Sequence, residues 1–342
     1  MHISKWFGII LATTLLAAPA QAQDNGDGED GLGETLEQVG ELYGKPYVQP
    51  LVDGIGADLN SGLFQSADIS GGMLPLVDVY VGLKAFGAVV GSGSESFDLQ
   101  LEDGESFQIP NSDGEEVIID GDQTLEDLPT FFGTDQPGER ELNVRGRGGF
   151  NETVEFEPIQ GFLQTSVTPL AAPHVEIGSS VIGTSLTLRY IPHALSAAYQ
   201  DYGSIGMYGV GVRHDIGQYV PLLPMSIAAQ VMYQNVNVRD TDDAEVLAIN
   251  NWAGNVAVSK SFFVATIYGG LQLESAGVTV DYDVPRPNDP DAEPIPINYE
   301  LNGANSVRAL AGVSIHPGPV AFNVDFSLAS VPVITAGVGL TL

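Results

Sequence analysis

The strongest constraint on the fold is a period-two alternation of apolar and polar residues that runs to the last residue of the chain. Over 320–328, apolar side chains occupy every second position, with Asn323 and Asp325 among the residues between them. The pattern resumes over 334–342, where glycine and threonine take the intervening positions. Because successive side chains of a strand point to opposite faces, we predict a hairpin with one apolar face and one small or polar face.

The same alternation extends back along most of the chain. It predicts eleven strands, at 57–67, 76–90, 170–178, 181–190, 203–215, 223–238, 249–260, 263–282, 307–315, 320–328 and 334–342. The connections after residue 170 alternate between short turns and longer, acidic or proline-rich segments, as in outer-membrane barrels. Because single-chain bacterial barrels have an even number of strands, we expect about 12 strands, with 14 as the alternative.

The composition of the two strand faces separates a membrane barrel from a soluble β-sandwich. A soluble sandwich also alternates, but its exposed face carries Lys, Glu and Arg. Here one face is apolar and the other is mainly Gly, Ser, Thr, Asn and Gln. We therefore predict an all-β fold, a transmembrane antiparallel β-barrel with its apolar face toward lipid and its polar face toward a lumen.

The N-terminus has the pattern of a cleaved export signal. Lys5 precedes a short apolar run at 6–16, and Ala20-Gln21-Ala22 forms an A-x-A cleavage site. We expect a signal peptide at 1–22 and a mature chain that begins at Gln23. Together with the barrel, this predicts the outer membrane of a Gram-negative bacterium, with outer-membrane lipid and the barrel assembly machinery as partners.

The rest of the chain divides by composition. Residues 23–32 form a flexible acidic leader, 33–56 a helical plug-like segment, and 57–342 the barrel. Apolar residues at helical spacing, such as Leu36 and Val39, predict a helix that breaks at Pro46. The barrel carries an extracellular insertion at 91–158 with 18 acidic residues. Within it we expect a small hairpin near Phe97 and Phe107 and a short helix at 125–132.

Charge and motifs exclude several functions. A net charge of −32 with 12 basic residues excludes nucleic acid as a partner, since phosphate binding needs Lys and Arg. His214 and Asp215 are adjacent on a strand and face opposite ways, and no nucleophile elbow is present. The acidic loop at 289–293 has a proline where a calcium loop needs glycine. We predict that the protein is not an enzyme and holds no cofactor or metal.

The inward positions of the predicted strands provide the candidate site. Their polar and charged side chains would either brace the barrel interior or line a selective path. The lumen-lining candidates are Asp78, Tyr80, Lys84, Arg189, Arg213, Gln230, Gln234, Tyr268, Glu274, Arg308, Asn323 and Asp325.

Three short runs carry a resemblance to a known family. The segments 48–64, 128–133 and 209–224 resemble an uncharacterised family of outer-membrane β-barrel proteins, a domain of unknown function, of the Bacteroidetes and Rhodothermota. The organisation is loosely similar to that of the long-chain fatty-acid outer-membrane transporter family, with an N-terminal plug and a barrel. The resemblance implies fold and location but no ligand residue. The chain differs from the common barrel pattern in ending on Leu342 rather than on an aromatic residue.

Two functions follow from these expectations. The first is a passive channel or transporter for small or hydrophobic solutes, gated by the segment 33–56 and the outer loops. The alternative is a structural or surface-interaction barrel whose acidic loops bind cations, polysaccharide or a partner. A lumen packed with side chains would favour the second function over the first.

Overall fold

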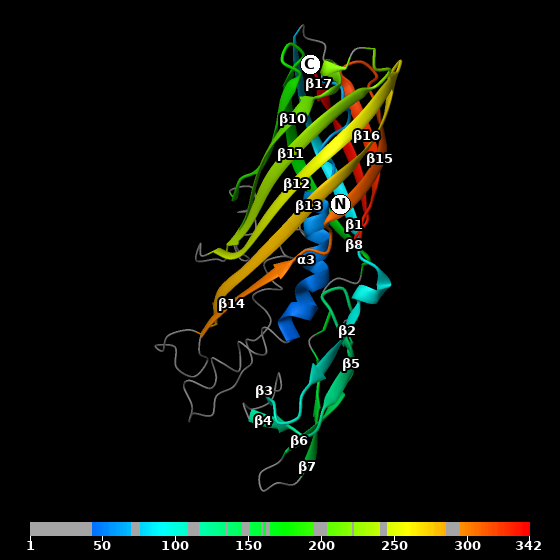
Figure 1. The fold of residues 1–342 in the computed structure, drawn as a ribbon. Helices are drawn as coiled ribbons and strands as arrows, with labels where there is room; N and C mark the ends of the chain where they lie inside the picture. Colours follow the sequence, from blue (N-terminus) through cyan, green and yellow to red (C-terminus); the bar gives the residue numbers. More distant parts are fainter. Residues whose placement is uncertain are drawn as a thin grey trace.

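The part of the chain that the structure describes forms a closed ten-stranded antiparallel β-barrel with an α-helix and a projecting β-region (Figure 1). The computed structural model describes residues 43–69, 76–108, 116–134, 136–145, 151–158, 160–161, 165–193, 204–220, 222–239, 245–284 and 295–342. The barrel strands are β1 (Val77–Val89), β8 (Val167–Ser179), β9 (Thr184–Ile191), β10 (Ser204–Asp215), β11 (Ser226–Arg239), β12 (Glu245–Phe262), β13 (Ala265–Val284), β15 (Val307–Ile315), β16 (Val320–Leu328) and β17 (Val333–Thr341).

Neighbouring strands in the wall are mostly neighbours in sequence. The sheet order runs β12-β11-β10-β9-β8-β1-β17-β16-β15-β13, and the pairing of β12 with β13 closes the ring. The predicted C-terminal hairpin is β16–β17, and β17 pairs in turn with β1. The first and last wall strands therefore meet, and both chain ends of the wall lie at the same end of the barrel.

The expectation of 12 or 14 strands is wrong, because ten strands close the barrel. The odd number of eleven predicted strands arose because one of them, 57–67, is not part of the wall. The segment 57–67 continues a helix to Leu59 and then follows an irregular path inside the barrel. Its apolar residues Leu63 and Phe64 are buried side by side rather than alternating. Its sequence resembles that of a wall strand because a segment enclosed by the barrel also carries buried apolar residues.

The two ends of the barrel differ in their connections. One end carries the connections 180–183, 216–225, 263–264 and 316–319, together with Leu342, and is called the short-turn end. The opposite end carries the long segments between β1 and β8, β9 and β10, and β13 and β15, and is called the long-loop end. The three longest segments therefore lie at one end, as predicted, but the alternation is not strict, because the turn 329–332 lies at the long-loop end and the longer connection 216–225 at the short-turn end.

The wall changes its polarity along the barrel axis. On β12, the inward residues Leu247 and Ile249 near the long-loop end are buried and apolar, whereas the inward Asn251 begins a polar series. Outward, the order is reversed: Asn250 is exposed and polar, and Trp252 begins an exposed apolar series. The barrel therefore has a polar lumen and apolar exterior over most of its height, and an apolar interior beyond Trp252.

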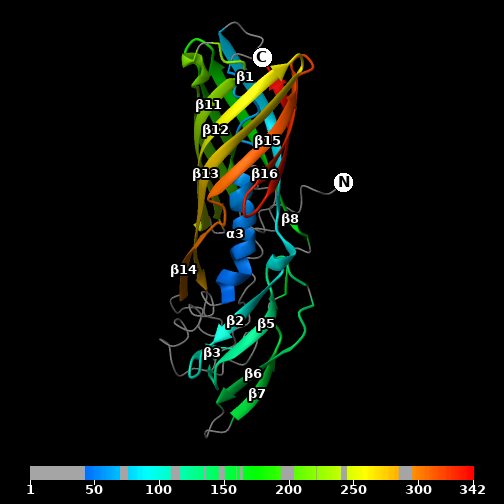
Figure 2. The ribbon, with the colours of Figure 1, turned by 45° about the vertical axis from the view of Figure 1, so that its right-hand side comes forward.

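The helix α3 (Lys45–Leu59) lies along the barrel axis at the long-loop end (Figures 1 and 2). Pro46 stands in the first turn of α3, where a missing backbone N–H costs nothing. The expected signal peptide, leader and first part of the plug-like segment lie outside the described residues. Among the described residues, no helix is both long and apolar enough to cross a membrane.

The insertion between β1 and β8 forms two small sheets that project beyond the long-loop end (Figure 2). One pairs β2 (Ser96–Leu101) with β5 (Gln123–Pro129), and the other has the order β3 (Ser106–Gln108), β4 (Glu116–Ile119), β6 (Arg140–Arg145) and β7 (Asn151–Phe156). The predicted hairpin is wrong, because β2 and β3 pair with different partners. We call residues 92–158 the projection. An eleventh strand of the main sheet, β14 (Ile295–Asn302), pairs with the part of β13 that lies at the same end.

The predicted helix at 125–132 is also wrong, and the helix-like spacing of its apolar residues has another cause. Leu125 and Leu128 are buried three residues apart, as on a helix face. In β5 an irregular register opposite Phe97 and Leu99, with Asp127 at a φ of 55°, inserts an extra residue between the two leucines. A β-bulge of this kind places residues three apart on one face of a strand.

Candidate functional site

Residues 45–69 fill the lumen and are called the plug. Their main chain is held by side chains of the surrounding wall. At the helix end, Asn251 donates to the Gly56 carbonyl (3.0 Å) and Arg308 to that of Ala57 (2.8 Å). One turn further, Gln272 donates to the Asn60 carbonyl (2.8 Å). These carbonyls lie where the helix ends and helical partners run out, although the Gly56 carbonyl also accepts from the Asn60 N–H (3.3 Å).

Arg189 on β9 holds the turn after the helix. Its guanidinium donates to the carbonyls of Leu59 (3.0 Å), Ser61 (2.8 Å) and Gly62 (2.8 Å). Gln234 accepts from the same guanidinium (3.0 Å) and itself donates to the Leu59 carbonyl. A guanidinium presents five donors in a fixed planar arrangement, so one buried cation can bind three carbonyls within four residues of the plug backbone.

The extended part of the plug is held in the same way toward the short-turn end. Gln230 donates to the Leu63 carbonyl (3.3 Å) and Ser314 to the Gln65 carbonyl (2.7 Å). Arg213 donates to the Ser66 carbonyl and pairs with Glu176. The plug therefore runs through the lumen from the long-loop end to the short-turn end, with wall side chains bound to its backbone.

Other buried polar groups of the wall satisfy one another. Arg308 pairs with Glu274 through its Nε and Nη2 atoms, at 2.8 Å each. Lys84 donates to Asn323 (2.7 Å), and the Tyr268 hydroxyl donates to Asp325 (3.0 Å). A buried charge is tolerated best when it is paired and hydrogen-bonded. The Arg308–Glu274 pair meets that condition, whereas these contacts give Lys84 and Asp325 neutral hydrogen-bond partners.

The structure brings the twelve candidate lumen residues together around the plug. Eleven of them are less than 6% exposed, and Asp78 is half-buried at the short-turn end. The sequence reasoning did not select several residues that also bind the plug or its clamps: Glu176, Asn251, Ser259, Gln272 and Ser314. All five occupy inward positions of predicted strands, so strand phase alone was the signal that could have identified them.

The outer end of the plug, with Tyr43 just before it, has a different, apolar environment. The ring of Tyr43 packs against Phe97 of the projection at 5.3 Å, and that of Tyr47 against Phe131 at 6.3 Å. The Tyr47 carbonyl also accepts from the Phe131 N–H (3.0 Å). Burial raises the pKa of Tyr47 to about 12 and raises the pKa of Asp53. The projection is thus in direct contact with the plug.

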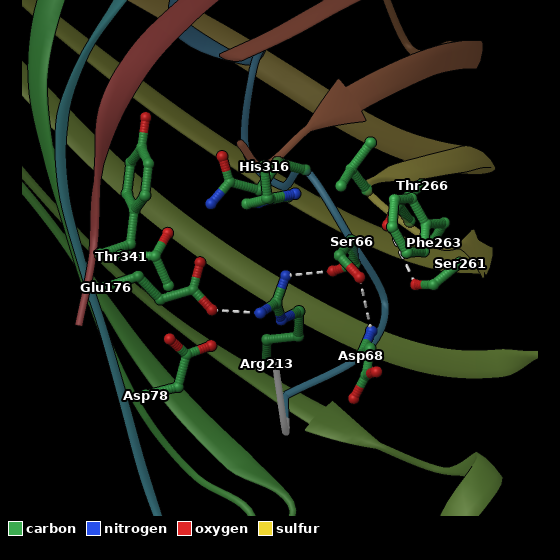
Figure 3. A pocket seen from close by; sticks show the side chains of 13 residues that line it. Ser66, Asp68, Asp78, Glu176, Arg213, Ser261, Phe263, Thr266, His316 and Thr341 are labelled. Carbon is green, nitrogen blue, oxygen red and sulfur yellow. Dashed lines mark hydrogen bonds and ion pairs between the residues drawn. The ribbon is translucent and has the colours of Figure 1, made fainter. Parts of the chain in front are cut away.

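A cavity of about 280 Å³ lies between the plug and the wall at the short-turn end (Figure 3). Arg213 stands at its centre with Glu176 and Asp78 beside it, and Ser66 and Asp68 of the plug close one side. Within the described part of the chain, no cluster of three or more His, Asp or Glu side chains is placed to hold a metal ion.

Comparison with solved structures gives distant resemblances. The NalP autotransporter translocator domain of Neisseria meningitidis has a TM-score of 0.23 and 9% identity, covering 80% of this chain and 90% of that one. The toluene transporter TbuX of Ralstonia pickettii has a TM-score of 0.23 and 9% identity, covering 79% and 89%. The toluene transporter TodX of P. putida has a TM-score of 0.25 and 10% identity, covering 85% and 98%. TM-scores this low support no argument about function.

The sequence comparisons are more decisive. No curated protein matches the sequence. A family match extends over residues 1–342, which include the barrel, the plug and the projection. The chain belongs to the Family of unknown function (DUF6588).

Proposed function

We propose that the protein is an outer-membrane β-barrel whose lumen is a channel for small solutes, closed here by the plug. The apolar exterior supports the location. Trp252 and Phe262 both face outward on β12, at 48% and 52% exposure. The strand between them rises about 33 Å at roughly 3.3 Å per residue. At a tilt of about 40°, that is about 25 Å along the axis, the height of the apolar band of such barrels.

The single observation that carries the channel proposal is the kind of contact between plug and wall. Over 56–66, most contacts run from wall side chains to plug carbonyls, and the side chains include three arginines. Water can replace such bonds when the plug moves, and the polar wall left behind would suit an aqueous path. A barrel with a purely structural lumen needs only its own side chains to fill it.

The projection supports a gating role. It contacts the outer end of α3 through Phe97 and Phe131, so a force on the projection reaches the plug directly. Opening would require α3 to leave its apolar surroundings at the long-loop end and would break the clamps of Arg189 and Arg308. A small or hydrophobic solute that binds near this apolar cluster is the candidate cargo.

The test combines a loosened and a locked plug in planar bilayers. Arg189→Met together with Gln234→Leu removes the clamp on the turn after α3 and should increase conductance over wild type. Gly54→Cys with Thr168→Cys should lock α3 to β8, because the two Cβ atoms would lie 3.0 Å apart, within about 1 Å of disulfide geometry. The chain has no cysteine of its own, so the introduced pair is the only disulfide.

The locked pair placed in the loosened background should abolish the added conductance, and reduction should restore it. The two single-cysteine variants are the controls. If the loosened protein is folded, as judged by heat-dependent migration on SDS gels, and neither conducts nor admits solute, the channel proposal is wrong.

The second candidate function is surface interaction, and the packed lumen together with the ordered projection favours it. The projection buries its own apolar residues, among them Leu128 and Leu142 at 0% exposure, and presents acidic residues to solvent. Replacing 92–164 with a short turn should then remove binding of cations or polysaccharide to cells that display the protein. Unchanged binding would exclude this role.

A further inference from the structure

The first wall strand carries a buried lysine whose amine contacts an amide two strands away. Lys84 on β1 and Asn323 on β16 both face the lumen and are 1% and 2% exposed. The Lys84 Nζ atom lies 2.7 Å from the side-chain oxygen of Asn323. Strand β17 lies between them, paired with β1 on one side and with β16 on the other. The contact therefore spans the seam at which the first and last wall strands meet.

A glycine on the intervening strand makes this contact possible. Gly337 of β17 is paired with Lys84 on one side and with Asn323 on the other. A Cβ atom at Gly337 would collide with Oδ1 of Asn323 and would lie 2.8 Å from Cδ of Lys84. The three residues therefore form a row across three strands, in which the amine and the amide meet over the glycine.

The two side chains are the reactants for an amide bond. A neutral lysine amine is a nucleophile, and the side chain of Asn323 is an acyl group whose leaving group is ammonia. The Asn323 Nδ2 atom is buried and forms no geometrically complete hydrogen bond to the described residues, although the Tyr268 hydroxyl lies near this side chain. Because both reactants are shielded from bulk water, water does not compete with the amine for the carbonyl carbon.

The reaction also needs a group that moves protons, and Asp325 is placed for this. It lies two residues after Asn323 on β16, so the two side chains point to the same face of the strand, and it is 5% exposed. The Tyr268 hydroxyl donates to its carboxylate (3.0 Å). Among the charged groups around Lys84, Asp325 has the largest electrostatic effect on the amine. A carboxylate, an amine and an amide are thus gathered at one place in the lumen.

We propose that Lys84 and Asn323 form an intramolecular isopeptide bond that fastens β1 to β16 across β17. The Lys84 ammonium gives a proton to the Asp325 carboxylate, and the free amine attacks Cγ of Asn323. Asp325 then gives this proton to the departing Nδ2 nitrogen and takes a second proton from the Lys84 nitrogen, as the Cγ–Nδ2 bond breaks. Ammonia carries the second proton away as ammonium, and the carboxylate is restored. The reaction needs no oxidant, and the proposal holds whether or not the lumen opens.

Mass spectrometry of the full chain, purified from outer membranes, tests this. The wild-type mature chain should be lighter than its sequence by about 17 Da, the ammonia lost when an amine takes the acyl group. The expected N-terminal Gln23 can lose ammonia by cyclising, so a linked peptide is the decisive evidence. Trypsin does not cleave after an acylated lysine, so the tryptic fragment that ends at Arg140 should be joined to the fragment 309–342.

The variants separate the chemistry from the fold. In Lys84→Met and in Asp325→Asn, the fragment 309–342 should be released free, and Asp325→Asn should be cleaved after Lys84. Gly337→Ala keeps all the reacting groups and should lower the linked fraction, because the methyl group separates the amine from the amide. Lys260→Met removes an exposed lysine of β12 and should leave the link intact. Each protein is first shown to be folded by heat-dependent migration on SDS gels.

After boiling, the linked wild-type chain should migrate ahead of Lys84→Met, because the isopeptide bond keeps the denatured chain in a loop. A free fragment 309–342 as the main product of folded wild type overturns the proposal. This digest decides even where a variant does not fold. An equal linked fraction in Asp325→Asn would overturn the proton-carrying role of Asp325.

Discussion

Arg308 is 1% exposed, yet every part of its guanidinium meets a partner. It pairs with Glu274, and it donates to the hydroxyls of Ser61 and Ser327 and to the Ala57 carbonyl. One residue therefore joins two wall strands to the plug. The ion pair itself contributes little to the free energy of unfolding, but removing Arg308 would leave the buried Glu274 charge unpaired, which is costly.

Arg308→Met should lower the free energy of unfolding by about 3–5 kcal/mol, because it leaves the buried Glu274 carboxylate without its cation and with only the hydrogen bond from Gln272. Arg145→Met is the control. It breaks an ion pair with Asp103 and Asp120 in which the Arg145 side chain is 44% exposed, and water screens that pair. Denaturant unfolding in lipid vesicles should show a large loss for the first variant and little change for the second. Equal losses would contradict the assigned role of Arg308.

Gly62 illustrates a second residue-scale constraint. It adopts a φ of +59° where the plug turns after α3, and a Cβ there would lie 2.7 Å from Phe86 and 2.8 Å from Thr335. Gly318, in the short turn between β15 and β16, has a similar φ of +76° but nothing within 4 Å. Both glycines have a positive φ, which strains any other residue, and they differ in the space available to a Cβ atom.

Gly318→Ala should therefore cost about 1 kcal/mol, from the left-handed backbone alone. Gly62→Ala should cost a further 1–3 kcal/mol or so, because the methyl group must displace Phe86 or Thr335. Chemical denaturation of the two variants side by side measures the difference. A loss at position 62 no larger than at 318 would show that the plug is loosely seated in the lumen.

At the scale of the element, the long wall strands β12 and β13 each contain two segments of opposite polarity. On β13, the outward Leu271 and Leu273 are 66% and 58% exposed and apolar, whereas the outward Thr279 lies beyond the level of Trp252, where β14 pairs with the strand. The inward side changes in the opposite sense, from Gln272 to the fully buried Val280. This change of polarity on both faces marks the level at which the strand leaves the proposed membrane and packs around α3.

Leu271→Arg should destabilise the inserted barrel by about 2–4 kcal/mol, the cost of a cation in the middle of the lipid-facing band. Thr279→Arg, on the same face of the same strand, should have little effect, because that position lies outside the band and opposite Glu300. Folding yields into lipid vesicles measure both. A severe effect of Thr279→Arg would move the membrane boundary toward the long-loop end.

At the scale of the whole molecule, the projection is an insertion into a hairpin. β1 and β8 pair continuously from Val77–Ser179 to Val89–Val167, and the Val90 N–H donates to the Ser166 carbonyl. The described residues of the projection therefore contribute no strand to the barrel wall. The plug, by contrast, depends on both the barrel and the projection, because its inner part is bound to the wall and its outer part to the projection.

Replacing 92–164 with a short glycine-serine turn should leave a folded, heat-modifiable barrel. The first turn of α3 should become sensitive to protease, since Tyr47 loses Phe131 and its backbone bond. Cleavage near Lys45 in the shortened protein, but not in the full chain, would show this. A shortened chain that fails to form the barrel would mean that the projection is needed for closure.

Strand positions and faces could be predicted from the sequence, because each depends on a local pattern. Ten of the eleven predicted segments are wall strands, and residues such as Arg189 and Gln234 fall on the predicted inward face. The errors arose where a local pattern had two explanations. Leu125 and Leu128 gave a helical spacing through a bulge, and Leu63 and Phe64 gave an apolar run inside the lumen.

The sequence by itself determined a wall with one apolar and one polar face, because every wall residue meets either the exterior or the lumen and must suit it. Only the tertiary structure decided that ten strands close the ring and that residues 45–69 occupy its interior. The physical reason is that the plug is held mainly through its backbone carbonyls, by Arg189, Arg213 and Arg308. Every residue carries a carbonyl, so the sequence does not mark which ones these arginines will bind.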